Sequence, residues 1–213
     1  MARTLQPSGK RPATTRREDP INTATTSADD STTTSRDAEF DAATVRSLVH
    51  IRELGPGDGD VVDVVFAGLS PHSRYLRFQG PIAELSAATR RSLTALDGRT
   101  HVALAAFTKG RPIGIVRIID LSDGRAELAV EVVDRWQGRG VGTQLLQAAR
   151  NRAADMGYRE FVGEMLVVNA AAHAALRRVF RVTRVHRDGS ELTITMPVNH
   201  APAPASPAEG LVA

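Results

Sequence analysis

The sequence predicts a single α+β domain, in which helices pack on a mixed β-sheet. Two patterns carry this prediction. Between residues 100 and 133, three short runs with a period near two are separated by turn sequences, as in antiparallel strands. Between residues 141 and 198, two runs with helical spacing alternate with further strands. A meander followed by strand–helix–strand units indicates a mixed sheet rather than an all-parallel one.

The first elements are a strand and three helices. The strand is expected over residues 45–54, and the "GPGDG" that follows ends it. Helices are expected over 60–69, 73–78 and 86–96, and Asp97-Gly98 ends the last of them.

The meander has three strands, over 100–107, 113–120 and 126–133. "TKGRP" and "SDG" are the turns between them, and such short connections make successive strands antiparallel neighbours.

The remaining elements follow a glycine-rich loop. Apolar residues recur at helical spacing from Val141 to Met156, and Gly157 stands where a left-handed C-cap belongs. A strand is expected over 160–168, and Asn169 is a good N-cap for a helix over 170–179. Two closing strands, over 181–186 and 190–198, meet at "RDGS".

The two ends of the chain differ in composition from the domain between them. Residues 1–42 are rich in Ser, Thr, Arg and Asp, and residues 200–213 are rich in Pro and Ala. Such segments bury too little apolar surface to offset the entropy lost on ordering. We therefore expect disordered tails at 1–42 and 200–213, and one folded domain at 43–199.

Composition excludes several classes of protein. Cysteine is absent, which excludes disulfide scaffolds, zinc–thiolate sites and cysteine nucleophiles. The histidines have no ligand spacing, so no metal is expected. No apolar run is long enough to cross a membrane and no signal peptide is visible, which predicts a cytoplasmic protein. The net charge of +3 comes from scattered arginines with few aromatics, which argues against nucleic-acid binding.

The loop "QGRGVG", residues 137–142, predicts a phosphate site. A dinucleotide fingerprint fails because Thr143 stands where its last glycine or alanine belongs, and a Walker loop fails because no lysine follows Gly142. What remains is a strand–loop–helix junction whose backbone amides and helix dipole could hold a pyrophosphate without a metal. The alternative is that the glycines merely form a tight turn.

The stretch "VVDRWQGRGVGTQLLQAA" closely resembles the coenzyme A loop of the GNAT superfamily of N-acetyltransferases. The similarity in element order runs from about residue 45 to residue 198. "LSPHSRYLRF" and "AELAVEVVDRWQGRG" further resemble the acetyltransferase domain of bacterial protein-lysine acetyltransferases. The resemblance implies a GNAT-like acyl-CoA N-acyltransferase fold and transfer of an acetyl group from acetyl-CoA to a primary amine.

The resemblance also implies positions for the donor. In such enzymes the acyl-pantetheine arm lies between two splayed strands, pairs with backbone groups of the first strand, and ends in a pyrophosphate held by the loop. Gln137 is expected to order the loop and Arg139 to face solvent, while Asn169 matches an asparagine that contacts the cofactor arm. The implied cofactor-binding residues are Val130, Glu131, Val132, Val133, Gln137, Gly138, Arg139, Gly140, Val141, Gly142, Thr143 and Asn169.

Glu127 is the predicted catalytic base. An amine acceptor must lose a proton, and Glu127 stands ten residues before Gln137, where the resemblance places a glutamate base. Glu131 is the reserve candidate, and a solvated strand glutamate is the alternative interpretation of Glu127. Many relatives have a tyrosine acid seven residues after the asparagine, but this chain has Leu176 there.

Three hypotheses of function remain at this point. The leading one is an acetyl-CoA-dependent N-acetyltransferase that modifies protein lysines. The others are an acetyltransferase of small-molecule amines and a non-catalytic coenzyme A-binding sensor or interaction module.

Overall fold

The structure is a computed structural model that describes residues 48–199. The tails predicted at 1–42 and 200–213, and residues 45–47 of the first predicted strand, lie outside this range. No helix within the described part of the chain is long and apolar enough to cross a membrane.

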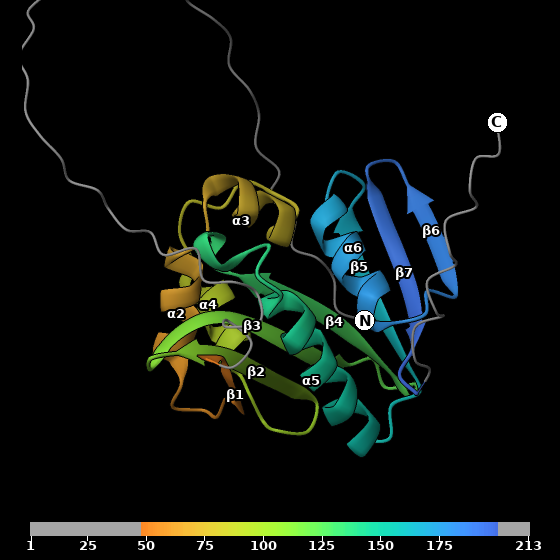
Figure 1. The fold of residues 1–213 in the computed structure, drawn as a ribbon, viewed down its shortest axis with the longest axis horizontal. Helices are drawn as coiled ribbons and strands as arrows, with labels where there is room; N and C mark the ends of the chain where they lie inside the picture. Colours follow the sequence, from red (N-terminus) through yellow and green to blue (C-terminus); the bar gives the residue numbers. More distant parts are fainter. Residues whose placement is uncertain (1–47, 200–213) are drawn as a thin grey trace, which may run out of the picture. The chain divides into compact units, whose positions relative to one another are not determined.

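The strands and helices follow one another in the predicted order (Figure 1). The strands are β1 (His50–Glu53), β2 (His101–Thr108), β3 (Arg111–Asp120), β4 (Arg125–Val132), β5 (Glu160–Leu166), β6 (Arg184–Asp188) and β7 (Glu191–Pro197). The helices are α2 (Gly59–Ala67), α3 (Pro71–Phe78), α4 (Ala87–Thr94), α5 (Val141–Asp155) and α6 (Ala170–Val179), with a 3-10 turn η1 at Asp134–Trp136.

All seven strands form one mixed sheet in the order β1-β2-β3-β4-β5-β7-β6. Neighbouring strands are antiparallel except β4 and β5, which are parallel. The predicted meander and the predicted mixed α+β sheet are both confirmed. The single parallel pair follows from α5, because a helical crossover returns the chain in the same direction.

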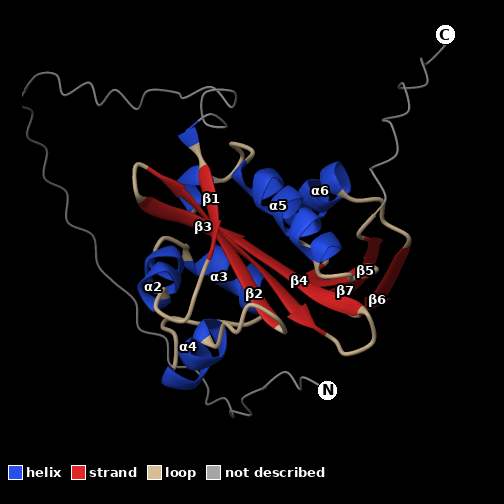
Figure 2. Ribbon diagram, turned by 90° about the horizontal axis from the view of Figure 1, so that it is seen from below, coloured by secondary structure: helices blue, strands red, loops and turns tan. Residues whose placement is uncertain are grey.

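The helices cover the two faces of the sheet unequally (Figure 2). Helices α5 and α6 lie on one face, and α2, α3 and α4 lie on the other. The apolar stripe of α5 is fully buried against the sheet, as its spacing predicted, and comprises Val141, Leu145, Leu146, Ala149 and Ala153. Gly157 has a φ of 82°, which is the left-handed conformation expected where this helix ends.

A glycine in β3 lets α5 approach the sheet closely. A Cβ atom on Gly114 would lie 2.9 Å from the backbone oxygen of Glu131 and 3.0 Å from Cδ1 of Leu145. Any larger residue would push α5 away from β4, and the start of α5 carries the glycine loop.

The last hairpin differs from its prediction. The strand expected over 181–186 is β6, Arg184–Asp188. Phe180 is buried in the core, so the residues after it must lead the chain out to the edge of the sheet. On this path, the backbone N–H and the hydroxyl group of Thr183 both donate to the backbone oxygen of Thr195. The edge strand therefore begins later, and every side chain of β6 is exposed.

Candidate active site

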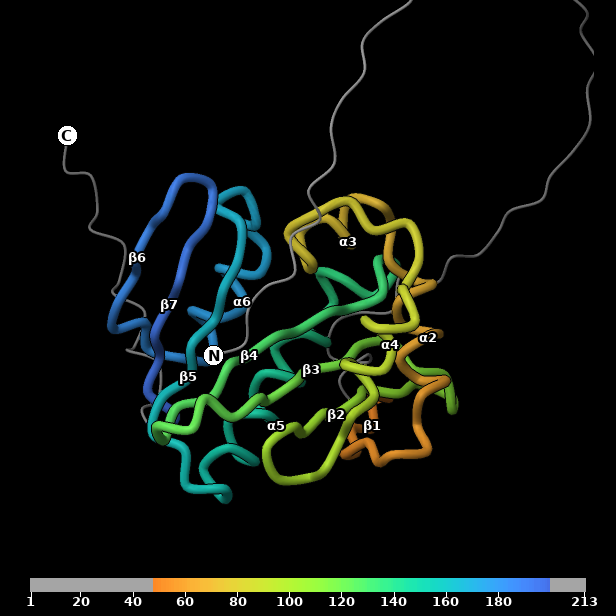
Figure 3. The backbone as a smooth tube through the Cα atoms, turned by 180° about the vertical axis from the view of Figure 1, so that it is seen from behind, coloured from red at the N-terminus to blue at the C-terminus, as the bar shows by residue number. Residues whose placement is uncertain are grey.

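Strands β4 and β5 separate after a short stretch of pairing. Their register runs only from Arg125–Glu160 to Glu127–Val162, although β4 continues to Val132 and β5 to Leu166. Figure 3 shows the two strands close together where both begin and apart where both end. The sheet is thus split along the second half of β4.

The split leaves backbone groups of β4 without a strand partner. The N–H of Val133 donates to the oxygen of Ile113 in β3, so by alternation the backbone groups of Val130 and Val132 point toward the split. Nε2 of Gln137 donates to the oxygen of Val132 at 2.9 Å. Both groups of Val130 and the N–H of Val132 remain available to an extended ligand.

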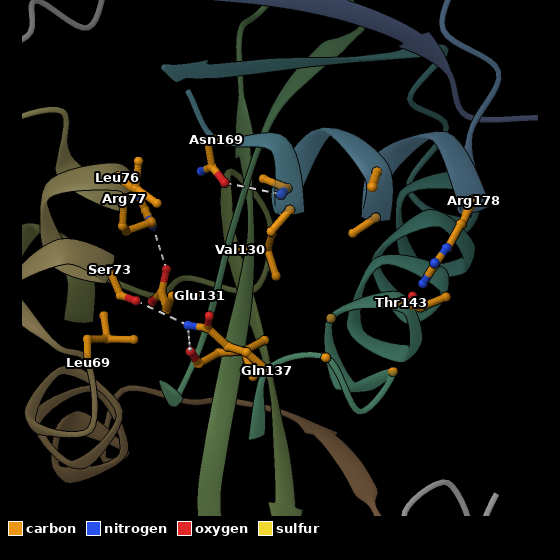
Figure 4. A pocket seen from close by; sticks show the side chains of 18 residues that line it. Leu69, Ser73, Leu76, Arg77, Val130, Glu131, Gln137, Thr143, Asn169 and Arg178 are labelled. Atoms are coloured by element: carbon orange, nitrogen blue, oxygen red, sulfur yellow. Dashed lines mark hydrogen bonds and ion pairs between the residues drawn. The ribbon is translucent and has the colours of Figure 1, made fainter. Parts of the chain in front are cut away.

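A cavity of about 350 Å³ lies along this split (Figure 4). Its walls come from four elements: α3, β4, the loop that leads into α5, and α6. The lining residues are Leu69, Ser73, Leu76, Arg77, Val130, Glu131, Val132, Gln137, Gly138, Gly140, Gly142, Thr143, Asn169, Ala171, Ala172, Ala174, Ala175 and Arg178.

The glycine loop forms one end of the cavity. Gly138 and Gly140 have φ values of 72° and 82°, a conformation that glycine adopts without strain. No side chain caps the start of α5, so its first-turn amides have no capping acceptor, and the positive end of the helix dipole lies behind them. A helix start of this kind attracts anions, and the pyrophosphate site at this junction stays a prediction.

Gln137 ties the loop to its surroundings. Besides its bond to Val132, its Nε2 lies 3.2 Å from Oγ of Ser73 and 3.3 Å from Oδ1 of Asp134. One amide group therefore links α3, β4 and η1.

Three predicted cofactor residues do not line the cavity. Val133 and Val141 are buried in the core, with exposed fractions of 6% and 0%. The guanidinium of Arg139 lies 5.6 Å from the centre of the Trp136 ring. Any contribution from these residues would come through the backbone of the strand and the loop.

Asn169 lines the cavity and also caps α6. Its Oδ1 accepts a hydrogen bond from the Ala172 N–H at 3.1 Å. The cap occupies the side-chain oxygen and leaves the Nδ2 group for a ligand.

Glu127 lies at the closed end of the split. It is the last residue of β4 that pairs with β5, and its side chain is half-buried without lining the cavity. Burial raises the pKa of its carboxyl group, the charge of Arg77 partly opposes this rise, and that of Glu164 adds to it. Within residues 48–199, nothing donates a hydrogen bond to this carboxylate.

Glu131, the reserve candidate, is held by two arginines. Nε of Arg77 donates to its Oε2 at 2.6 Å, and Nη1 of Arg117 donates to its Oε1. Burial would raise the pKa of Glu131, but Arg117 and Arg77 outweigh it and hold that pKa below its usual range. The β3–β4 register has no bulge between Gly114 and Asp120, so Glu127 and Glu131 share one face of β4.

Comparison with known proteins identifies the family. Residues 72–180 match the model of the acetyltransferase (GNAT) family. The chain is 32% identical to Acetyltransferase PA5475 of Pseudomonas aeruginosa over 134 residues, which are 61% of this chain and 70% of that protein. The chain belongs to the acetyltransferase (GNAT) family.

Other members of the GNAT family are similar to this chain. An aminoglycoside N(6')-acetyltransferase type 1 of Stenotrophomonas maltophilia is 29% identical over 142 residues, covering 62% of this chain and 86% of that protein. The solved GNAT domain of S. lividans PAT superposes with a TM-score of 0.65 at 26% identity, over 70% of this chain and 90% of that domain.

Family membership establishes the general chemistry. This GNAT protein is an acetyl-CoA-dependent N-acetyltransferase, with acetyl-CoA as co-substrate and an amine as acceptor. A solved Salmonella typhimurium acetyltransferase of the same fold contains acetyl-CoA, with a TM-score of 0.56 at 19% identity over 74% of this chain and 98% of that chain. The split between β4 and β5, the cavity along it and the uncapped start of α5 fit such a donor. No cluster of potential metal ligands occurs among residues 48–199.

The position of the tyrosine acid found in many relatives is apolar here. Leu176 is 4% exposed and packs in the core, so it offers no proton. Tyr75 is 43% exposed and does not line the cavity.

Several residues of this GNAT site were missed at the sequence level. Ser73, Leu76 and Arg77 line the cavity from one face of α3, and their helical spacing is a signal that could have grouped them. Arg117 interrupts an apolar strand, which also marks it as unusual. Arg178 of α6 also lines the cavity (Figure 4), and no local pattern distinguishes it from Arg177.

Proposed function

We propose that this protein acetylates primary amines, with protein lysine side chains as the acceptor class, and that Glu127 is the general base. The position of Glu127 carries the proposal: a half-buried carboxylate without a donor, at the closed end of the β4–β5 split. Along β4 it precedes the cavity-lining residues Val130 to Val132, on the side away from the glycine loop.

The reaction is a direct transfer. A lysine-type amine has a pKa near 10.4, so only about one in two thousand is neutral at pH 7. The acceptor nitrogen attacks the thioester carbonyl carbon, the carbon–sulfur bond breaks, and the nitrogen's proton passes to Glu127, directly or through water. The thiolate takes a proton from water, since Leu176 supplies none, and Glu127 returns its proton to solvent.

The acceptor class is supported by similarity and by exposure. "LSPHSRYLRF" and "AELAVEVVDRWQGRG" resemble protein-lysine acetyltransferases. Beyond Glu127, Glu164 on β5 and every side chain of β6 are exposed, which would allow a large acceptor to approach.

Small amines are the second candidate. The similarity to an aminoglycoside acetyltransferase, whose printed substrate is a small molecule, is the observation that favours them.

Thiol release from acetyl-CoA tests both parts of the proposal. Wild type and Glu127→Gln are assayed against a panel of lysine-rich proteins and a panel of small amines. Loss of a general base should lower kcat by about 10² to 10⁴ while the Kd for coenzyme A stays unchanged.

Glu164→Gln is the matched control, because it removes an exposed carboxylate near Glu127 on the neighbouring strand. It should lose far less activity. Undiminished turnover in Glu127→Gln would remove Glu127 as the base, and turnover restricted to the amine panel would replace the acceptor class.

A further inference from the structure

Three charged side chains meet on one face of the sheet beside the proposed base. Arg117 on β3 pairs in register with Ala129, so it lies diagonal to both Glu127 and Glu131 on β4. Diagonal neighbours in a sheet are within reach of long side chains. Arg77 comes from α3 and binds Glu131 (Figure 4).

The two arginines are shared unequally between the two glutamates. Both donate to Glu131, through Nε of Arg77 and Nη1 of Arg117. Within residues 48–199, neither forms a hydrogen bond or an ion pair with Glu127. Arg117 is fully buried, and its Nε and Nη2 have no hydrogen-bond partner in the described part of the chain. The cluster therefore holds unused donors beside a second carboxylate.

This sharing separates the properties of the two carboxylates. A carboxylate bound by guanidinium groups favours its charged form and has its oxygens occupied, so it is a poor proton acceptor. The pKa of Glu131 is accordingly below its usual range, whereas burial raises that of Glu127. Opposite shifts in neighbouring groups are how active sites assign acid and base roles.

The surroundings of Glu127 contain few other charges. In register, Ile119 faces it from β3 and Val162 faces it from β5, with Glu160 and Glu164 on either side of Val162. The cations on this face include Arg77 from α3 and Arg117 from β3, and both are held by Glu131. Arg125 lies two residues before Glu127 on β4 and is paired with Asp123.

We propose that Glu131 is a positioning residue that binds Arg77 and Arg117 and thereby leaves the carboxylate of Glu127 unpaired and available to the acceptor's proton. The inference rests on the proposed function of Glu127. Without Glu131, both released guanidinium groups have Glu127 within reach, because the charge of Arg77 already acts on it and Arg117 is its diagonal neighbour.

The test is Glu131→Gln, which keeps the shape of the side chain and removes its charge. The pKa of Glu127 is measured by ¹³C NMR of labelled carboxyl groups, and the acidic limb of kcat/KM against pH is measured in parallel. An arginine that turns to Glu127 should lower that pKa by about one to three units and move the acidic limb to lower pH. The acidic limb should persist in Glu131→Gln, and the plateau value of kcat/KM should be about 10- to 100-fold lower than in wild type.

Two results would overturn the proposal. One is a Glu127 pKa that is unchanged in Glu131→Gln. The other is loss of the acidic limb itself, because that would make Glu131 the base. The NMR titration requires no turnover, so it is independent of whether Glu127→Gln proves active.

A second variant separates release of the arginines from loss of the glutamate. In Glu131→Gln/Arg77→Met, one released cation is gone, so the pKa of Glu127 should return toward the wild-type value and part of the rate should return. No recovery in either quantity would count against the proposal.

If Glu131→Gln does not fold, Arg77→Leu/Arg117→Met/Glu131→Leu replaces the cluster with apolar side chains, an exchange that buried ion clusters often tolerate. In this triple variant the acidic limb of kcat/KM should lie at the same pH as in wild type or at a higher pH. An acidic limb at lower pH would contradict the proposal.

Discussion

Glu127 and Glu131 show how neighbours decide what a side chain does. Both are glutamates on the same face of β4, four residues apart. Two guanidinium groups occupy Glu131, while Glu127 is half-buried with no donor among the described residues. Only one of them combines an available oxygen with a raised pKa. The sequence made both glutamates candidates for the base, and their different hydrogen-bond partners in the fold distinguish them.

The raised pKa of Glu127 predicts a stability cost at neutral pH. A carboxyl group whose pKa is higher in the folded state binds a proton more tightly there, so its contribution to stability is lost as pH rises through that pKa. Glu127→Gln should therefore raise Tm by about 1–3 °C at pH 7.5.

The gain in Tm should shrink as pH falls toward the usual glutamate pKa of about 4.3, where the wild-type side chain is also neutral. Differential scanning calorimetry from pH 4 to pH 8 measures it, with Glu164→Gln as the exposed control. A Glu127→Gln variant that is less stable than wild type at pH 7.5 would contradict the prediction.

Arg178 is predicted to contribute to donor binding, because its cationic side chain lines the same cavity as the glycine loop (Figure 4). An exposed arginine paired with a phosphate contributes modestly, so Arg178→Ala should raise the KM for acetyl-CoA about two- to fivefold. Added salt should shrink the effect.

Arg177→Ala is the control on the same helix, since Arg177 is exposed and does not line the cavity. Acetyl-pantetheine, which lacks the phosphates, should give the same KM for Arg178→Ala as for wild type. An equal loss with that donor would show that Arg178 acts on something other than phosphate.

At the scale of elements, the sequence predicted what depends on local pattern and missed what depends on distant contacts. The period of two in the meander and the apolar stripe of α5 are local, and both predictions were confirmed. The start of β6 depends on how Phe180 enters the core, so a local pattern placed it too early.

The same division applies to the site. The "QGRGVG" loop was found because its strand–loop–helix context is local. The partners of Glu131 were not, because Arg77 lies 54 residues and Arg117 14 residues away along the chain. Only the fold brings them together.

The junction between the loop and α5 gives a prediction with a matched control on the same helix. Gly140 and Gly157 lie at opposite ends of α5 and both have a φ of 82°. Aspartate at either position should cost about 1 kcal/mol in backbone strain. Only Gly140→Asp places a carboxylate beside the proposed pyrophosphate site, so it alone should weaken coenzyme A binding by tenfold or more.

Isothermal titration calorimetry measures the affinity of Gly140→Asp and of Gly157→Asp for coenzyme A, and the Tm of each variant measures its loss of stability from backbone strain. Undiminished affinity in Gly140→Asp would remove the pyrophosphate from this end of the cavity. Equal losses of affinity in both variants would point instead to a general effect on α5.

At the scale of the folded domain, the split divides the sheet into two groups of strands. Strands β1 to β4 form one group and β5, β7 and β6 form the other, and the groups pair only from Arg125 to Glu127 on β4. The cavity lies where pairing stops, with walls from β4 and from α6, the helix that follows β5. A donor seated there would bridge them, as an added strand would.

Hydrogen exchange with fragments of the donor tests this bridging. With coenzyme A bound, the amides of Val130 and Val132 should exchange at least tenfold more slowly, because they would donate to the pantetheine arm. Adenosine 3′,5′-diphosphate has no such arm, so it should slow exchange only near Gly138 to Thr143. If both ligands protect β4 equally, the change is a general tightening of the fold. Protection of Val130 that requires the pantetheine arm would instead show that the donor completes the sheet across its one gap.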